Sequence, residues 1–162
     1  MEGLKIIIPT KGVNIFFIQN LINTLKEFKN SFLFVLDAPN YLLEEYLKKE
    51  KINWIRNFQE NGFTGAVNSG ILKAGKCEYL LILNDDVIIY PEIIDDFIKG
   101  TKDLDIVGPV SNNVGGIQRR NYSVNPENYL PFAEKLRNKE GKILTGFLSG
   151  FCLFIKVGNR DT

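Results

Sequence analysis

The stretch Tyr79-Leu80-Leu81-Ile82-Leu83-Asn84-Asp85-Asp86-Val87 decides how the rest of this chain is interpreted. Its leading apolar residues suit a buried β-strand, and three polar residues, two of them carboxylic acids, follow directly. Adjacent carboxylates repel one another and resist leaving water, so this placement makes chemical sense if a cation binds there. Asp and Asn oxygens suit Mg²⁺ or Mn²⁺, ions that commonly bridge to phosphate. The alternative is a strand that ends in an Asx-rich turn, and the stretch taken alone favours that alternative.

The composition excludes several classes of protein. The 162 residues fit one domain, 44% are apolar and 24% charged, and the net charge of +1 indicates no nucleic-acid or membrane partner. No apolar run has the length of a membrane span, and the first residues enter a strand pattern rather than a signal peptide. Cys77 and Cys152 lack metal-binding spacing, so we expect buried or half-buried thiols in a cytoplasmic protein. Histidine is absent, which excludes Ser-His-Asp and Cys-His catalysis and leaves metal and acid–base chemistry chiefly to carboxylates.

Strand-like and helix-like segments alternate along the chain. The patterns predict strands at residues 4–8, 32–36, 52–55, 79–83 and 106–110, and helices at 15–28, 41–49, 63–74, 92–101 and 131–138. The alternation implies right-handed βαβ crossovers and therefore an α/β fold, with a Rossmann-like, mostly parallel sheet and helices on both faces. Ligands of such sheets bind beyond the carboxyl ends of the strands. We therefore expect residues 9–12, 37–40 and 84–86 to gather at one edge, and residues 111–128 to form a long loop.

Two further features fit an anionic ligand at that edge. Residues 61–70 are rich in glycine and small side chains, follow the third predicted strand and open a helix, whose N-terminus favours an anion. They do not form a P-loop or a dinucleotide fingerprint, and a glycine-rich turn with close helix packing is an equally good interpretation. Lys11, Arg119 and Arg120 could neutralise a diphosphate there, although each alone suits a solvated surface position.

Together these segments resemble the family 2 glycosyltransferases, which have the GT-A fold. Ile6-Ile7-Ile8-Pro9-Thr10 resembles the opening strand of the family, and residues 61–71 resemble its Asn-Gly-x-x-x-Ala-x-Asn-x-Gly segment. Residues 81–87 resemble the strand that bears the Asp-x-Asp motif, with Asn84 in place of the first Asp, and residues 148–156 resemble the later segment that borders the acceptor site. The resemblance implies one GT-A domain over residues 1–162, with residues 1–110 binding a nucleotide sugar and residues 111–162 on the acceptor side.

The resemblance also implies an activity, which is transfer of a sugar from a nucleotide-diphosphate donor to a glycan or other hydroxyl acceptor, with inversion at the anomeric carbon. Asp86 would bind Mn²⁺ or Mg²⁺ joined to the diphosphate, with Asp85 beside it, and the metal would stabilise charge on the departing diphosphate. The remaining donor-site residues fall into two sets. Pro9, Thr10 and Asp37 would hold the base and ribose, and Asn61, Phe63 and Asn68 would line the nucleotide pocket, with Lys11 near the diphosphate.

The resemblance is incomplete towards the C-terminus. In the family the catalytic base is an Asp or Glu well after the segment that matches Ser149-Gly150, and here Asp161 is the sole acid after Glu140. We expect the family's C-terminal helices and its late His to be missing, which would leave apolar surface that a second copy of the chain could cover. The sequence thus leaves open an enzyme with Asp161 as base and a non-catalytic nucleotide-sugar-binding module. A receiver-like signalling domain is disfavoured, because the first strand ends without an acid.

Overall fold

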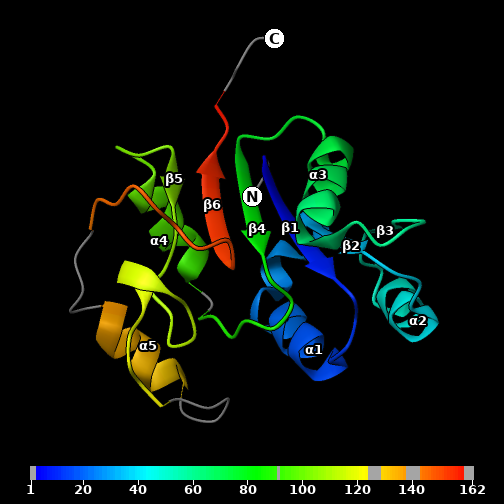
Figure 1. Ribbon diagram of the computed structural model, residues 1–162, viewed down its shortest axis with the longest axis horizontal. Coiled ribbons are helices and arrows are strands. Elements are labelled where there is room, and N and C mark those ends of the chain that lie inside the picture. Colours follow the sequence, from blue (N-terminus) through cyan, green and yellow to red (C-terminus); the bar gives the residue numbers. More distant parts are fainter. Residues whose placement is uncertain (1–2, 91, 124–128, 138–142, 159–162) are drawn as a thin grey trace.

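A six-stranded sheet in the order β3-β2-β1-β4-β6-β5 forms the centre of the molecule (Figure 1). The computed structural model describes residues 3–90, 92–123, 129–137 and 143–158. The strands are β1 Leu4–Thr10, β2 Phe32–Leu36, β3 Trp54–Arg56, β4 Tyr79–Leu83, β5 Ile106–Val107 and β6 Cys152–Lys156. β1 to β4 are parallel, and β6 is antiparallel to both β4 and β5. The predicted mostly parallel α/β sheet is confirmed.

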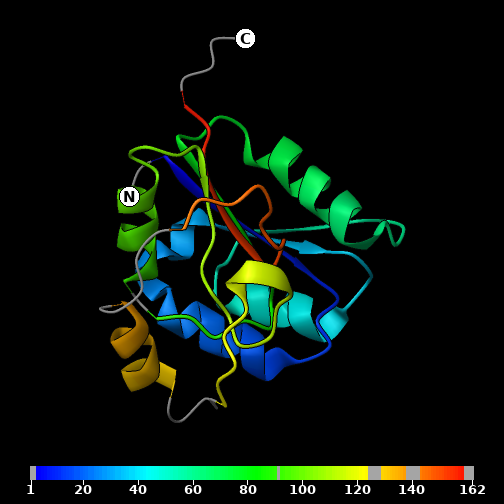
Figure 2. The same cartoon turned by 60° about the vertical axis from the view of Figure 1, so that its left-hand side comes forward.

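Helices cover both faces of this sheet. They are α1 Ile15–Thr24, α2 Tyr41–Lys49, α3 Gly62–Ala74, α4 Ile93–Gly100 and α5 Tyr129–Arg137, with 3₁₀ turns η1 Lys26–Ser31 and η2 Gly116–Gln118. Figure 2 shows α3 on one side of the sheet and α1 and α2 on the other. Alternate residues of β1 serve the two faces, since Ile6 and Ile8 belong to the larger core cluster and Ile7 to the cluster beneath α3. No helix of the described ranges is long and apolar enough to span a bilayer.

α3 lies unusually close to the sheet. A Cβ atom added to Gly70 would stand 2.5 Å from Ile7 Cγ2 and 3.0 Å from Val35 Cγ2, so only glycine fits at this point of the helix. The glycines of this segment, predicted to serve either a ligand or close packing, therefore include at least one that serves packing. Because α3 follows the parallel strand β3, its N-terminal end lies at the carboxyl edge of the sheet.

Several element boundaries differ from the prediction for identifiable reasons. The predicted helix at 15–28 is interrupted at Leu25, after which η1 continues with the tighter 3₁₀ turn; Leu25 and Phe28 still reach the core, because a three-residue spacing suits both helix types. β5 is shorter than predicted, since only Ile106 and Val107 pair with β6. The predicted loop at 111–128 contains η2 and a bridge between Ser111 and Arg119.

β1 runs through Pro9, which the sequence predicted as its end. It pairs with β2 as far as Thr10–Leu36 but with β4 only as far as Ile7–Ile82. Pro9 has no N–H to donate, and the ladder with β4 stops two residues before it. β1 and β4 therefore part near their carboxyl ends, which leaves room for side chains of the acid-bearing segment after β4.

Candidate active site

A cavity of about 460 Å³ lies where β1 and β4 part. The residues that line it come from the segments after β1, β2 and β4, from the first turn of α1 and from α3; they are Pro9, Thr10, Lys11, Val13, Asn14, Phe17, Asp37, Phe63, Ala66, Asn84, Asp85 and Asp86. The predicted meeting of the three post-strand segments at one edge is confirmed. Two of the predicted donor-site residues are not among the lining residues. These are Asn61, which contacts Asp37 through its backbone, and Asn68, which is exposed on α3.

Thr10 and Asp85 join the two strands across the gap. The buried Thr10 hydroxyl donates to Asp85 Oδ2 and accepts a hydrogen bond of 2.8 Å from the Gly12 backbone N–H. Burial raises the pKa of the Asp85 carboxyl above its ordinary value and the charge of Asp86 raises it further, while the Thr10 hydrogen bond lowers it. Asp85 is thus a carboxylate whose charge is only partly compensated by the protein, as expected of a group that gains stability from a bound cation.

Asp37 is a buried carboxylate with one free oxygen. Its side chain is 3% exposed, and Oδ1 accepts from Asn57 Nδ2 at 3.1 Å and from the Asn61 backbone N–H at 3.0 Å. Oδ2 is buried and has no hydrogen-bond partner among the described residues. A buried acceptor without a partner is costly, so this oxygen is suited to receive an N–H or O–H donor from a ligand in the cavity.

The acids after β4 fit a hard divalent cation that is shared with a ligand. Asp86 is exposed, Asp85 is half-buried, and Asn84 Oδ1 is buried without a partner in the part of the chain that the structure describes. Those residues include no group of three His, Cys, Asp or Glu side chains that could hold a metal. Mg²⁺ and Mn²⁺ often use one or two carboxylates and take their other ligands from water and phosphate oxygens. The donor set therefore fits an ion held jointly with a diphosphate.

The basic residues considered as diphosphate partners lie in different surroundings. Lys11 lines the cavity and forms an exposed ion pair with Glu60, which raises the pKa of the lysine. Arg119 donates to Asn121 Oδ1 on the loop after β5. Arg120 donates to the carbonyl oxygens of Ile117 and Arg119 and lines a second cavity, described below. Lys11 is therefore the basic residue that lies beside the acids.

Comparison with known proteins identifies the family. The family model described as Glycosyl transferase family 2 matches residues 5–160. The chain belongs to this family. No curated protein sequence matches it significantly.

Solved structures show the same fold for this family 2 domain. It superposes on S. aureus TarS 1-349 with a TM-score of 0.54 and 20% identity, over 72% of this chain and 38% of that one. It also superposes on S. aureus TarS 1-349 in complex with UDP-GlcNAc, with a TM-score of 0.55 and 21% identity, over 72% of this chain and 37% of that one. At this identity the likeness shows the fold, which confirms the predicted GT-A class. The domain spans less than two-fifths of the length of either TarS chain.

In this family 2 domain, β6 brings a distant segment to the same edge. Leu83 pairs with Cys152, and the Asn84 backbone N–H donates to the Phe151 carbonyl oxygen at 2.9 Å. Gly150 lies against the Phe63 ring, since a Cβ added to the glycine would stand 3.6 Å from Phe63 Cε1. The first residues of α3 and the segment before β6 therefore meet beside the acids after β4.

A second cavity, of about 890 Å³, adjoins the first. The two share Phe17, Asn84 and Asp86 in their linings. The second extends from these residues towards α4, η2, α5 and the segment before β6. Asp86 therefore stands between two spaces, of which one contains the predicted donor-binding residues and the other is formed mainly by residues after Asp86.

Sequence reasoning missed several residues of the site. Asn57, which holds Asp37, directly follows β3 and could have been found by the same post-strand rule that located Asp37 itself. Phe17 lies in the first turn of α1, where its apolar character gave no signal of a role beyond the core. Asp96, in the predicted helix at 92–101, accepts from Tyr90 and Arg137 and lines the second cavity, and its position in that helix gave no signal of this. Asp161 lies outside the described residues.

Proposed function

We propose that this chain binds a nucleotide-diphosphate sugar and transfers the sugar to a glycan or other hydroxyl acceptor with inversion. The observation that carries the proposal is the cavity between β1 and β4, where the acid pair Asp85–Asp86 and the half-partnered Asp37 lie at the carboxyl edge of a family 2 domain. Residues 1–110 would form the donor-binding part, and residues 111–162 the acceptor side. In the transfer, the acceptor oxygen bonds to the anomeric carbon, the bond from that carbon to the diphosphate oxygen breaks, and a base takes the hydroxyl proton.

The nucleoside would occupy the end of the cavity near Asp37. The free Oδ2 of Asp37 would accept a donor group of the base or ribose, beside Pro9 and Thr10, while Phe63 would cover the nucleotide from α3. Asn61 would act chiefly through its backbone bond to Asp37, which leaves its side chain and that of Asn68 for the outer rim. Lys11 would face the phosphates once its exposed pair with Glu60 opens, because an exposed ion pair is worth little.

Asp86, with Asp85 beside it, would hold Mn²⁺ or Mg²⁺ together with the diphosphate. When bound, the ion would act as a Lewis acid towards the departing diphosphate. Thr10 would favour the ionised form of Asp85, because its hydroxyl donates to the carboxylate and offsets part of the rise in carboxyl pKa that burial causes. Asn84 would fix the turn through its backbone bond to Phe151, and its buried Oδ1 would be available to water or donor.

The catalytic base is a carboxylate that would have to reach the acceptor hydroxyl. Three carboxylates among the described residues line the second cavity, namely Asp86, Asp96 and Asp105. Asp96 is held by Arg137 and Tyr90, and Asp105 precedes β5, at the opposite edge of the sheet from the carboxyl ends. We therefore retain Asp161 as the proposed base. A non-catalytic nucleotide-sugar-binding module is the second candidate, favoured because the described carboxylates that line the second cavity besides Asp86 are either held in an ion pair or lie away from the carboxyl ends.

Calorimetric titration with UDP-, GDP- and dTDP-sugars in the presence of Mn²⁺ tests donor binding. We expect one of these donors to bind, and Asp86→Ala to weaken it at least tenfold. Asp95→Ala is the matched control, since Asp95 is an exposed acid on α4 that lines neither cavity. Binding of no donor, or equal binding by the Asp86→Ala and control variants, would refute the proposal. Turnover of a bound donor that is lost in Asp161→Asn would decide for the enzyme against the binding module.

A further inference from the structure

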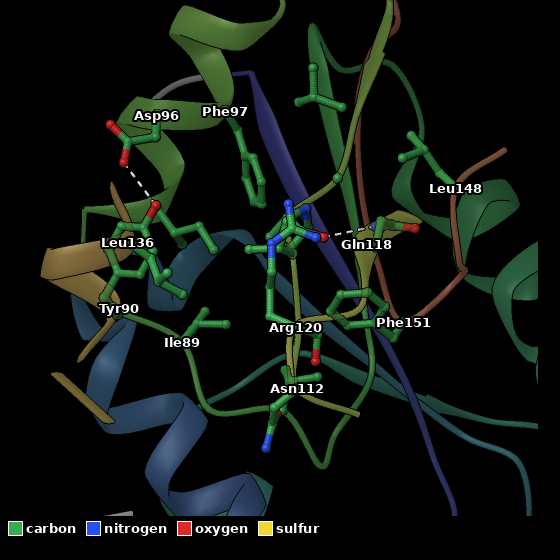
Figure 3. A pocket seen from close by; sticks show the side chains of 18 of the residues that line it. Ile89, Tyr90, Asp96, Phe97, Asn112, Gln118, Arg120, Leu136, Leu148 and Phe151 are labelled. Atoms are coloured by element: carbon green, nitrogen blue, oxygen red, sulfur yellow. Dashed lines mark hydrogen bonds between the residues drawn. The ribbon is translucent and has the colours of Figure 1, made fainter. Parts of the chain in front are cut away.

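The second cavity is built mainly from apolar side chains on four different elements. Figure 3 shows Ile89, Phe97, Leu136, Leu148 and Phe151 around one space, contributed by the segment after β4, α4, α5 and the segment before β6. Its volume of about 890 Å³ lies within the range of about 300–1,000 Å³ that is typical of small-molecule sites. The size and the convergence of separate elements indicate a binding site rather than a packing defect.

Several of its polar side chains already bond one another or the backbone. Gln118 is 4% exposed, donates to the Pro109 carbonyl oxygen at 2.8 Å and accepts from the Ser149 backbone N–H at 2.6 Å. Asp96 accepts from the Tyr90 hydroxyl at 2.8 Å and from Arg137 at 2.6 Å. These groups fix the walls and have little hydrogen-bonding capacity left for a ligand.

Two polar groups with spare hydrogen-bonding capacity lie where this cavity meets the donor cavity. Asn84 and Asp86 form its boundary with the donor cavity, and Asn84 Oδ1 is a buried acceptor with no partner in the ranges that the structure describes. A ligand that extends from this boundary towards α4 and α5 would therefore meet hydrogen-bonding groups near the donor and the apolar side chains of Phe97 and Leu136 further away. A glycan would have to bury many hydroxyls against that surface, which is unfavourable when they find no partners.

We infer that the second cavity binds the acceptor, and that this acceptor carries its reactive hydroxyl on an apolar alkyl or aryl body rather than within a longer glycan. The inference rests on the proposed function and narrows its acceptor class. The hydroxyl would lie near Asn84 and Asp86, where it can reach the anomeric carbon of a donor, and the apolar body would extend between α4 and α5. The Arg137–Asp96 pair would hold α5 as the outer wall, since α5 buries none of its own residues.

Binding of two glucosides that share a head group tests this inference without donor or metal. Hexyl β-D-glucoside and methyl β-D-glucoside differ by five methylenes, so we expect the hexyl compound to bind at least tenfold more tightly in a ligand-observed NMR titration. Leu148→Gln and Leu136→Gln should each weaken hexyl glucoside at least threefold. Leu72→Gln is the matched control, because Leu72 is an exposed leucine on α3 that lines neither cavity.

Three results would overturn the inference. They are equal binding of the two glucosides, tighter binding of cellobiose than of hexyl glucoside, and hexyl binding that neither cavity variant weakens. The wild-type comparison is decisive even if one variant fails to fold. A parallel titration of UDP with Mn²⁺ separates the two proposals, because loss of UDP binding argues against the donor site, whereas loss of the hexyl preference argues against the acceptor class alone.

Discussion

Replacing Thr10 by valine removes the hydroxyl that links β1 to the acid-bearing segment after β4 while keeping the shape of a buried side chain. Two hydrogen bonds disappear, one to the Asp85 carboxylate and one from the Gly12 N–H. A bond to a charged acceptor contributes about 1.5–3 kcal/mol and a neutral bond about 0.5–1.5 kcal/mol. We therefore expect the free energy of unfolding to fall by about 2–4 kcal/mol at neutral pH.

This loss should depend on pH in a defined direction. Burial raises the folded-state pKa of Asp85, so the carboxyl contributes stability below its unfolded pKa of about 3.9, and that contribution is lost as the pH rises through the raised folded value. The Thr10 hydrogen bond lowers the folded-state pKa of Asp85, so removing the bond raises this pKa further. As the pH rises and Asp85 ionises, the variant therefore loses more unfolding free energy than the wild type does. The difference between wild type and Thr10→Val should be smallest near pH 4 and largest near pH 8.

Urea unfolding between pH 4 and pH 8 measures this difference, and Thr101→Val serves as the control. Thr101 is 2% exposed and donates to the Ile98 carbonyl oxygen at 3.0 Å, with no carboxylate involved. Its valine variant should lose about 1 kcal/mol at every pH. Equal, pH-independent losses in the two variants would refute the role assigned to the Thr10–Asp85 bond.

Three further outcomes follow from the packing and charge of the molecule. Gly70→Leu should lower the unfolding free energy by about 3 kcal/mol or more in urea, because even a Cβ would stand 2.5 Å from Ile7 Cγ2; a loss below 1 kcal/mol would contradict the close approach of α3. Arg137→Met should cost only about 1 kcal/mol, since the pair with Asp96 is partly exposed, yet amide exchange in α5 should become faster, and unchanged exchange would argue against the pair as its tether. Mn²⁺ affinity in the presence of UDP should fall as acidification protonates Asp85, whose pKa is raised. If the affinity does not change between pH 4 and pH 8, this carboxylate is not a ligand of the ion.

The sheet was predictable because most of its strands have a clear pattern in the sequence. β1, β2 and β4 are buried on both faces, and a strand buried on both faces appears as a continuous apolar run. The position of β6 was not predictable in the same way. Residues 143–157 are apolar but interrupted by glycine, and β6 runs antiparallel through a long-range pairing with β4 that no local pattern encodes.

The site residues that directly follow a strand in the sequence were predictable. Asp37, Asp85 and Asp86 were located because polar residues after parallel strands gather at one edge. The hydrogen-bond partners of these acids were harder to predict from the sequence, because the bond between Thr10 and Asp85 depends on how β1 and β4 separate. The contacts of Asp96 could not be predicted for a similar reason, since Arg137 reaches it only through the placement of α5.

The separation of β1 from β4 connects the fold to the proposed chemistry. If the two strands paired as far as their last residues, the Thr10 side chain would face a continuous sheet and the segment after Leu83 would have no space beside it. The ladder instead ends at Ile7–Ile82, before Pro9, and the cavity lies between the diverging ends with Thr10 bonded across it to Asp85. The gap leaves Asp86 exposed to both cavities. If donor and acceptor are to meet, an ion shared with the diphosphate would have to lie at this boundary, beside Asp86.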